Sequence, residues 1–194
     1  ESAVQQRTIM EEKMNLQYIV TGYKDNYSIM EDSLILDGYR IEMEGFQKLD
    51  FNKVTKVVAY MISIDGNYKK EENLLETLYR DMWENAYLDA IRWNIMIEQK
   101  EEDTDIESFA PGLSNMKLSC MNILYHLLQG EQIGVTISDK MILSPLKSCA
   151  GFFVIHRDEV LEIDFCSTCK AKGNFCQYCV QRKDLKNETN LFHG

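Results

Sequence analysis

The chain has 194 residues, of which 45% are hydrophobic and 27% are charged, and its formal net charge is −10. This composition is typical of one globular domain with at most a small appendage, and it excludes a wholly disordered or collagen-like chain. The acidity disfavours general binding to nucleic acid or to an anionic membrane, and no apolar run approaches the length of a membrane span. We expect a cytoplasmic protein, because the first residues also lack the features of a signal peptide.

The charge is unevenly distributed along the chain. Residues 166–194 contain five basic and two acidic side chains, so this segment carries +3 and the remaining residues carry −13. We therefore divide the chain into an α+β domain at 1–165 and a cysteine-rich tail at 166–194. The acidic domain favours a partner with a basic rim, and their association is expected to slow as salt rises.

The first part of the domain is predicted to contain one helix and several strands joined by turns. These segments are a helix at 3–14, a strand at 18–23, a strand-turn-strand at 33–46 and a strand at 54–64. The turn within 33–46 is Asp37-Gly38, a pair typical of tight hairpins. The segment 54–64 has the strongest strand signal because it is rich in β-branched residues.

A long helix is predicted over about 70–99, where apolar residues recur at spacings of three and four. This spacing predicts one buried face along the whole helix. The residues of that face are Leu75, Leu78, Met82, Ala86, Ala90, Trp93 and Ile97. Charged side chains such as Glu76, Arg80 and Asp81 are expected on the solvent side, with the helix as the spine of the domain.

The second part of the domain is predicted to continue the mixture of helices and strands. The segments are an acidic connector at 101–108, a helix at 116–128 capped by Gly130, strands at 133–137 and 141–143, and a hairpin of 151–155 with 160–165. Most neighbouring strands are joined by connections too short for a parallel crossover. The predicted fold class is therefore α+β, with a largely antiparallel sheet, a long helix and flanking helices.

The order of motifs after residue 108 carries a resemblance to a known family. The motifs are Pro111-Gly112, the helix at 116–128, Ile133-Gly134-Val135, Met141 ahead of Pro145, and Lys147-Ser148 ahead of Phe152-Phe153. In this order the chain resembles the activation (reactivation) domain of cobalamin-dependent methionine synthase. The segment 58–66 before the long helix also looks like this family, so the resemblance covers about residues 15–165. Stand-alone bacterial members often carry extra cysteines at the C-terminus.

The resemblance implies a twisted antiparallel sheet, binding of S-adenosylmethionine, and docking onto a corrinoid-carrying partner. Such a partner is a corrinoid-binding protein or a methionine synthase without its own activation domain. When the cobalt of the corrinoid becomes oxidised, an electron donor and the methyl group of S-adenosylmethionine restore methyl-cobalt, and the activation domain presents that methyl group. The chain would then be one component of a methyltransferase system.

The family's S-adenosylmethionine motif is Arg-x-x-Pro-Gly-Tyr. Its cofactor-binding positions correspond to Ser108, Ala110, Pro111, Gly112 and Leu113. Serine replaces the arginine that would pair with the ligand carboxylate, and leucine replaces the tyrosine. Each lost charge-assisted hydrogen bond is worth roughly 1.5–3 kcal/mol, so binding weakens about ten- to a hundredfold unless another cation substitutes. Lys147 and Arg157 are the candidate substitutes, and a binding or redox module that no longer takes S-adenosylmethionine is the alternative hypothesis.

Four of the six cysteines form two Cys-x-x-Cys pairs within 14 residues. They are Cys166, Cys169, Cys176 and Cys179. Four thiolates at this spacing suit a tetrahedral zinc ion or an iron–sulfur cluster, and disulfides or free thiols are the alternatives. Zinc is the more common occupant, whereas a cluster would supply the electron that reactivation needs. Cys120 and Cys149 are expected to be packing residues, and no catalytic motif is present.

Overall fold

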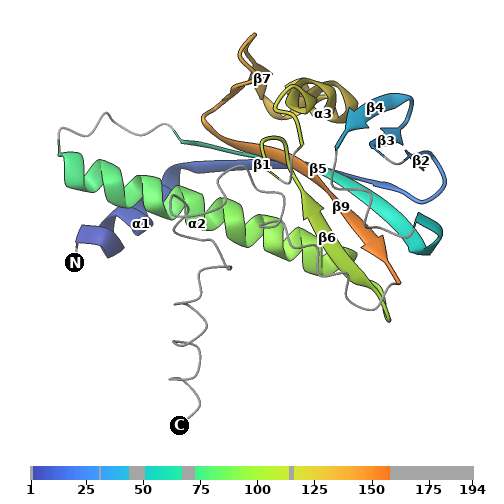
Figure 1. Cartoon of the computed structure of the whole chain (residues 1–194). Helices are drawn as coiled ribbons and strands as arrows, with labels where there is room; N and C mark the ends of the chain where they lie inside the picture. Colours follow the sequence, from blue (N-terminus) through green and yellow to red (C-terminus); the bar gives the residue numbers. More distant parts are fainter. Residues whose placement is uncertain (1, 31, 44–50, 67–72, 114–115, 158–194) are drawn as a thin grey trace, which may run out of the picture.

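A four-stranded antiparallel sheet lies at the centre of the computed structural model, which describes residues 2–30, 32–43, 51–66, 73–113 and 116–157. Its strands follow the order β1 (Met14–Tyr23), β5 (Val54–Gly66), β9 (Lys147–His156) and β6 (Asp105–Phe109) (Figure 1). The two central strands are buried on both faces, and residues 57–64 of β5 are buried without interruption. This burial explains the long apolar run in the sequence.

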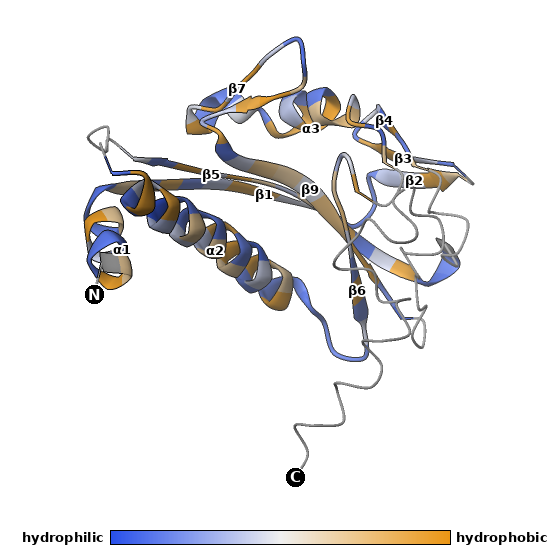
Figure 2. Cartoon of the chain, turned by 60° about the vertical axis from the view of Figure 1, so that its left-hand side comes forward, coloured by the Kyte–Doolittle hydropathy of each residue, from blue (hydrophilic) through white to orange (hydrophobic). Residues whose placement is uncertain are grey.

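Two helices cover one face of the central sheet. They are α1 (Ser2–Lys13) and α2 (Leu74–Gln99), both on the same side in Figure 2. The core on this side contains Val58, Tyr60, Ile62, Phe153 and Ile155 from the sheet and Ile95 from α2. The rings of Tyr60 and Phe153 stack with their centroids 4.7 Å apart. Asn73 caps α2, because its side chain accepts a hydrogen bond of 3.0 Å from the Leu75 N–H.

The opposite face is covered by α3 (Cys120–Leu128) and a small antiparallel sheet (Figure 2). The strands of this sheet are β2 (Tyr27–Met30), β3 (Ser33–Leu36) and β4 (Tyr39–Glu42). The remaining elements are the short pair β7 (Thr136–Ile137) and β8 (Leu143–Ser144), and the 3-10 helices η2 (Phe51–Lys53) and η3 (Gly130–Ile133). The described chain therefore forms three layers, with the central sheet in the middle.

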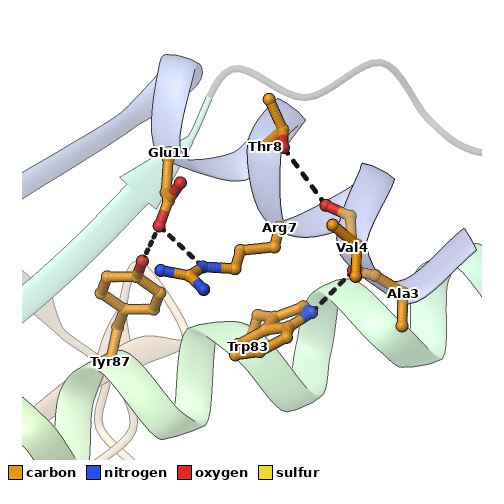
Figure 3. Close-up of polar contacts among 7 residues, drawn as sticks. All are labelled: Ala3, Val4, Arg7, Thr8, Glu11, Trp83 and Tyr87. Carbon is orange, nitrogen blue, oxygen red and sulfur yellow. Dashed lines mark hydrogen bonds and ion pairs between the residues drawn. The ribbon is translucent and has the colours of Figure 1, made fainter. Parts of the chain in front are cut away.

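Helix α1 contacts α2 through a cluster of polar and aromatic side chains, shown in Figure 3. The Trp83 Nε1–H donates a hydrogen bond of 2.9 Å to the carbonyl oxygen of Ala3. The Arg7 guanidinium lies 5.3 Å from the centre of the Trp83 ring, and its Nε donates to Glu11 at 2.9 Å. The Tyr87 hydroxyl also donates to the Glu11 carboxylate. These contacts hold α1 against α2.

The α+β class and the antiparallel pairing predicted from the sequence are confirmed. The strands predicted at 18–23 and 54–64 are present and longer, and 33–46 contains the hairpin of β3 and β4. Asp37 and Gly38 have φ values of 48° and 82°, as a two-residue hairpin turn of the mirror-image type requires. The second strand of the hairpin predicted at 151–155 and 160–165 lies outside the described residues.

Several predictions about local structure are wrong. The acidic connector at 101–108 contains most of β6, because pairing with β9 overrides the low strand propensity of aspartate and glutamate. The helix predicted at 116–128 begins only at Cys120, and Gln129 rather than Gly130 has the left-handed backbone at its end, with φ 52°. The strand predicted at 133–137 is reduced to the two residues of β7.

The prediction for the buried face of α2 is also wrong. Leu75, Leu78, Met82, Trp93 and Ile97 are between 49% and 59% exposed, and Ala86 and Ala90 are exposed as well. The helix instead turns Leu88, Ile91 and Ile95 towards the sheet. Both sets of residues recur at helical spacing, so periodicity alone does not decide which set meets the sheet. Among the described helices, none has the length and hydropathy of a membrane-spanning segment.

Candidate functional site

The motif at 108–113 forms the end of edge strand β6 and a tight turn. Pro111 and Gly112 occupy the two central positions, and the Leu113 N–H donates a hydrogen bond of 3.0 Å to the Ala110 carbonyl oxygen. Gly112 has φ +85°, a left-handed conformation that glycine adopts without strain. Proline followed by a residue with positive φ is typical of a type II turn. The Gly112 N–H donates to the carbonyl oxygen of Met116 at 3.0 Å.

This turn has a buried base and an exposed tip. Pro111 is buried, whereas Gly112 and Leu113 are exposed. Leu113 is 59% exposed, and Leu118 is 51% exposed. A Cβ atom built on Gly112 would lie 3.9 Å from Cδ1 of Leu118, so Leu118 lies beside the tip. The tip therefore offers accessible backbone next to a small apolar surface.

Ser108 lies on the face of the sheet that α2 covers. It pairs with Phe153 of β9, and its side chain interacts with the hydroxyl of Tyr60. Arg92 of α2 interacts with the same hydroxyl. Burial, with a further contribution from Cys149, raises the pKa of Tyr60 to about 12, and the interactions with Arg92 and Ser108 oppose this rise. Tyr60 is therefore a neutral group between β6 and α2.

Gly151 of β9 has no side chain, and the Tyr60 hydroxyl occupies the space beside it. A Cβ atom on Gly151 would lie 2.4 Å from the carbonyl oxygen of Phe109 and 2.7 Å from the Tyr60 hydroxyl oxygen. Both distances are shorter than van der Waals contact, so a larger residue would move the edge strand or the tyrosine. Gly151 therefore permits the approach of Tyr60 to Ser108.

Arg92 is one cation that the structure brings to the Ser108 side of the sheet, where both side chains interact with the Tyr60 hydroxyl. Its guanidinium pairs with Asp89 at 3.2 Å, and its side chain is 39% exposed. Arg92 could not be assigned from the sequence, because it lies 16 positions before Ser108 on a different element and belongs to no motif. No local sequence signal could have revealed this proximity.

The two cations considered from the sequence lie elsewhere. The Lys147 ammonium contacts Asp81 and donates a hydrogen bond of 2.9 Å to the Asn85 side chain. Arg157 follows Phe153 by four strand residues, which corresponds to about 13 Å. Its backbone N–H donates to the Lys53 carbonyl oxygen at 3.0 Å. Neither cation is held beside Ser108.

Two further ionisable side chains near β6 have unusual environments. Burial raises the pKa of Glu107 to about 7, with a smaller contribution from the charge of Asp105. Burial also raises the pKa of the Cys149 thiol to about 11, so Cys149 is protonated at neutral pH. Cys120 is buried, and its thiol contacts the Glu42 carbonyl oxygen at 3.6 Å. Both cysteines therefore pack within the domain, as expected.

A separate cavity of about 320 Å³ lies at the other end of the sheet. It is bounded by the end of β5, by the first half of α2 and by the segment 145–147. Arg80 and Lys147 contribute positive charge there, and Asp65, Asp81 and Glu84 contribute negative charge. The contact between Lys147 and Asp81 neutralises part of this charge within the cavity.

The cysteines predicted to bind metal, Cys166, Cys169, Cys176 and Cys179, lie outside the described residues. In the part of the chain that the structure describes, histidine, cysteine, aspartate and glutamate form no group of three or more able to hold a metal ion. The domain boundary predicted at 165–166 also lies outside these residues. No protein-family model and no curated protein sequence matches the chain.

Proposed function

We propose that this protein presents S-adenosylmethionine to the corrinoid cofactor of a partner methyltransferase during reductive reactivation of that cofactor. The proposal includes membership of the methionine synthase activation-domain family. The observation that carries it is the arrangement of the 108–113 motif. The turn exposes the backbone of Gly112 and Leu113, while Ser108 and Arg92 share the Tyr60 hydroxyl behind it.

In this proposal the residues of the motif have distinct roles. Pro111 holds the turn, and the Gly112 carbonyl group contacts the ligand, because the N–H groups of Gly112 and Leu113 and the Leu113 carbonyl oxygen already form hydrogen bonds around the turn. Leu113 and Leu118 supply apolar contact and exclude water from that side of the ligand. Arg92 supplies the positive charge that the serine at 108 lacks, because a guanidinium binds a carboxylate through paired hydrogen bonds. When bound, S-adenosylmethionine supplies a methyl group attached to a positively charged sulfur.

Calorimetric titration of the full chain with S-adenosylmethionine tests this proposal. We expect binding by the native protein, and a weakening of about ten- to a hundredfold for Arg92→Gln through loss of the charge-assisted contact. Arg40→Gln is the matched control, because Arg40 is an exposed arginine on β4 that pairs with Asp32 at 3.4 Å. No heat and no thermal shift with millimolar S-adenosylmethionine would refute binding.

A second candidate function is a docking or redox module that keeps the fold without binding S-adenosylmethionine. Two observations favour it: Ser108 and Leu113 depart from the motif, and Arg92 already has Asp89 as a partner. This candidate predicts binding to a corrinoid protein that weakens with salt, together with no response to S-adenosylmethionine. Affinity that is equal at low and high ionic strength would contradict docking through the acidic surface.

A further inference from the structure

Asp89 and Arg92 form a pair of opposite charges on α2, at the border between the buried face of the helix and solvent. Arg92 Nη2 lies 3.2 Å from Asp89 Oδ1, and the two side chains are 39% and 74% exposed respectively. Arg92 follows Ile91, which packs towards the sheet, and both charges of the pair act on the Cys149 thiol of β9. The pair therefore extends from solvent towards the central sheet and carries no net charge.

The buried side of this pair lies next to the end of β6. Arg92 interacts with the Tyr60 hydroxyl, which also interacts with Ser108. That hydroxyl oxygen and the Phe109 carbonyl oxygen lie 2.7 Å and 2.4 Å from the same point, the Cβ position of Gly151. The contact partner of Arg92 is therefore a close neighbour of the last residue of β6, where the exposed turn of the motif begins.

We propose that Asp89 and Arg92 together bind the amino-acid head group of the ligand, with its carboxylate on Arg92 and its ammonium group on Asp89. This inference rests on the proposed function, because S-adenosylmethionine carries such a head group. It assigns a binding role to Asp89, which belongs to no motif of the sequence. The chemical class that the pair recognises is a zwitterion whose two charged groups are adjacent.

The charge balance of the pair favours a zwitterion over a simple anion. An anion that binds Arg92 competes with the Asp89 carboxylate and deprives it of the cation beside it. A head group with an ammonium group gives Asp89 another cation, so both charges of the pair stay compensated. Because exposed ion pairs contribute little to stability, loosening the contact between Asp89 and Arg92 costs little.

The Arg92 guanidinium has enough donors for the ligand and for its neighbours in the chain. A guanidinium carries five N–H groups, and the contact with Asp89 uses one terminal nitrogen. Tyr60 is 1% exposed, so its contact with Arg92 is on the buried side. A carboxylate can therefore approach Arg92 from solvent while Tyr60 still holds the guanidinium, and the second oxygen of Asp89 can accept from the ammonium group.

Calorimetric titration of the full chain with three ligands tests the two contacts separately. S-adenosylmethionine has both charged groups of the head group, decarboxylated S-adenosylmethionine keeps the ammonium group, and methylthioadenosine has neither. We expect Asp89→Asn to weaken binding of the first two ligands by about two- to fivefold, and to leave methylthioadenosine unchanged. Arg92→Gln should weaken binding of S-adenosylmethionine and of neither other ligand.

Asp32→Asn is the matched control, because Asp32 is an exposed aspartate outside α2 that pairs with Arg40 at 3.4 Å. It should bind all three ligands as the native chain does. If Asp89→Asn leaves binding of S-adenosylmethionine unchanged or tightens it, the inference about Asp89 is overturned, while binding by the native chain still supports the proposed function. Equal weakening of S-adenosylmethionine and its decarboxylated form by Arg92→Gln also overturns it. A native chain that does not bind S-adenosylmethionine refutes both.

Discussion

At the scale of single residues, burial controls the protonation of the side chains around β6. Tyr60 and Cys149 lie on the α2 side of the sheet, and burial raises the pKa of Tyr60 to about 12 and that of Cys149 to about 11. Both groups stay neutral at physiological pH. Arg92 is therefore a charged group beside two neutral ones, and an anionic ligand would have to compete with Asp89, which lies 3.2 Å from its guanidinium.

Glu107 gives a pH-dependent prediction. Its pKa is about 7 in the folded chain against an ordinary value of 4.5, so the unfolded chain loses this proton first as pH rises. Below pH 4.5 Glu107 is protonated in both states, and its burial does not reduce the stability of the fold. Above about pH 7 it is ionised in both states, and the desolvation of the buried carboxylate then lowers the free energy of unfolding. Glu107→Gln removes the ionisable carboxyl group. The free energy of unfolding of the variant should therefore exceed that of the native chain by about 1–2 kcal/mol near pH 8, because the half-buried site remains partly screened by solvent, and by little near pH 4.5.

Urea unfolding at the two pH values measures this difference. Glu131→Gln is the control, because it removes one negative charge from an exposed position. A gain for Glu107→Gln that is equal at both pH values would show that desolvation of the carboxylate is not its source.

At the scale of elements, the attachment of α1 depends on one side of α2. The Arg7 guanidinium lies over the Trp83 ring, and the Trp83 Nε1–H donates a hydrogen bond to the Ala3 carbonyl oxygen (Figure 3). The Trp83 side chain therefore contacts the first two turns of α1. Met10 of α1 is fully buried, which adds apolar contact further along the helix. The stability of α1 is therefore expected to depend on contact with α2 more than on its own helical propensity.

Replacement of Trp83 tests this dependence. In Trp83→Ala we expect amide hydrogen exchange in residues 2–13 to accelerate by more than about tenfold, because the hydrogen bond and the aromatic contact are lost. Exchange in β5 should change little. Trp93→Ala is the matched control, since Trp93 lies on the same helix and is 59% exposed. Equal protection of α1 in both variants would contradict a special role for Trp83.

At the scale of the whole molecule, the sequence predicts a separate cysteine-rich tail at 166–194 after the α+β domain. The segment 166–179 contains only Phe175 and Tyr178 as large apolar side chains, which are too few for a core of its own. Ordering each residue costs on the order of 1–2 kcal/mol, whereas binding of structural zinc by thiolates releases roughly 10–16 kcal/mol. We therefore expect the tail to fold around a bound metal.

Elemental analysis of anaerobically purified full chain tests the metal prediction. We expect about one zinc, or several irons with visible absorbance, per chain. Cys169→Ser should abolish the metal and make the tail sensitive to protease, while the domain stays folded. Cys120→Ser is the control within the domain. Stoichiometric metal after replacement of all four tail cysteines would place the site elsewhere.

Some features of the protein follow from the sequence alone, because they depend on residues that are close in the chain. Asp37-Gly38 predicts a hairpin turn, since few residues adopt positive φ at two successive positions. Pro111-Gly112 predicts a turn for a similar reason, and the β-branched residues of 54–64 predict a strand. Each of these predictions agrees with the described structure.

Other features are decided only by the tertiary structure, because they depend on residues that are distant in the chain. Strand β6 forms despite its acidic residues, since β9 offers an edge for pairing. Helix α2 has two apolar sets at the same spacing, and only the position of the sheet determines which set is buried. Arg92 approaches Ser108 only because β6 pairs with β9 and because α2 packs on the same face of the sheet beside β6. For this reason the sequence predicted the turn of the candidate site but not its cation.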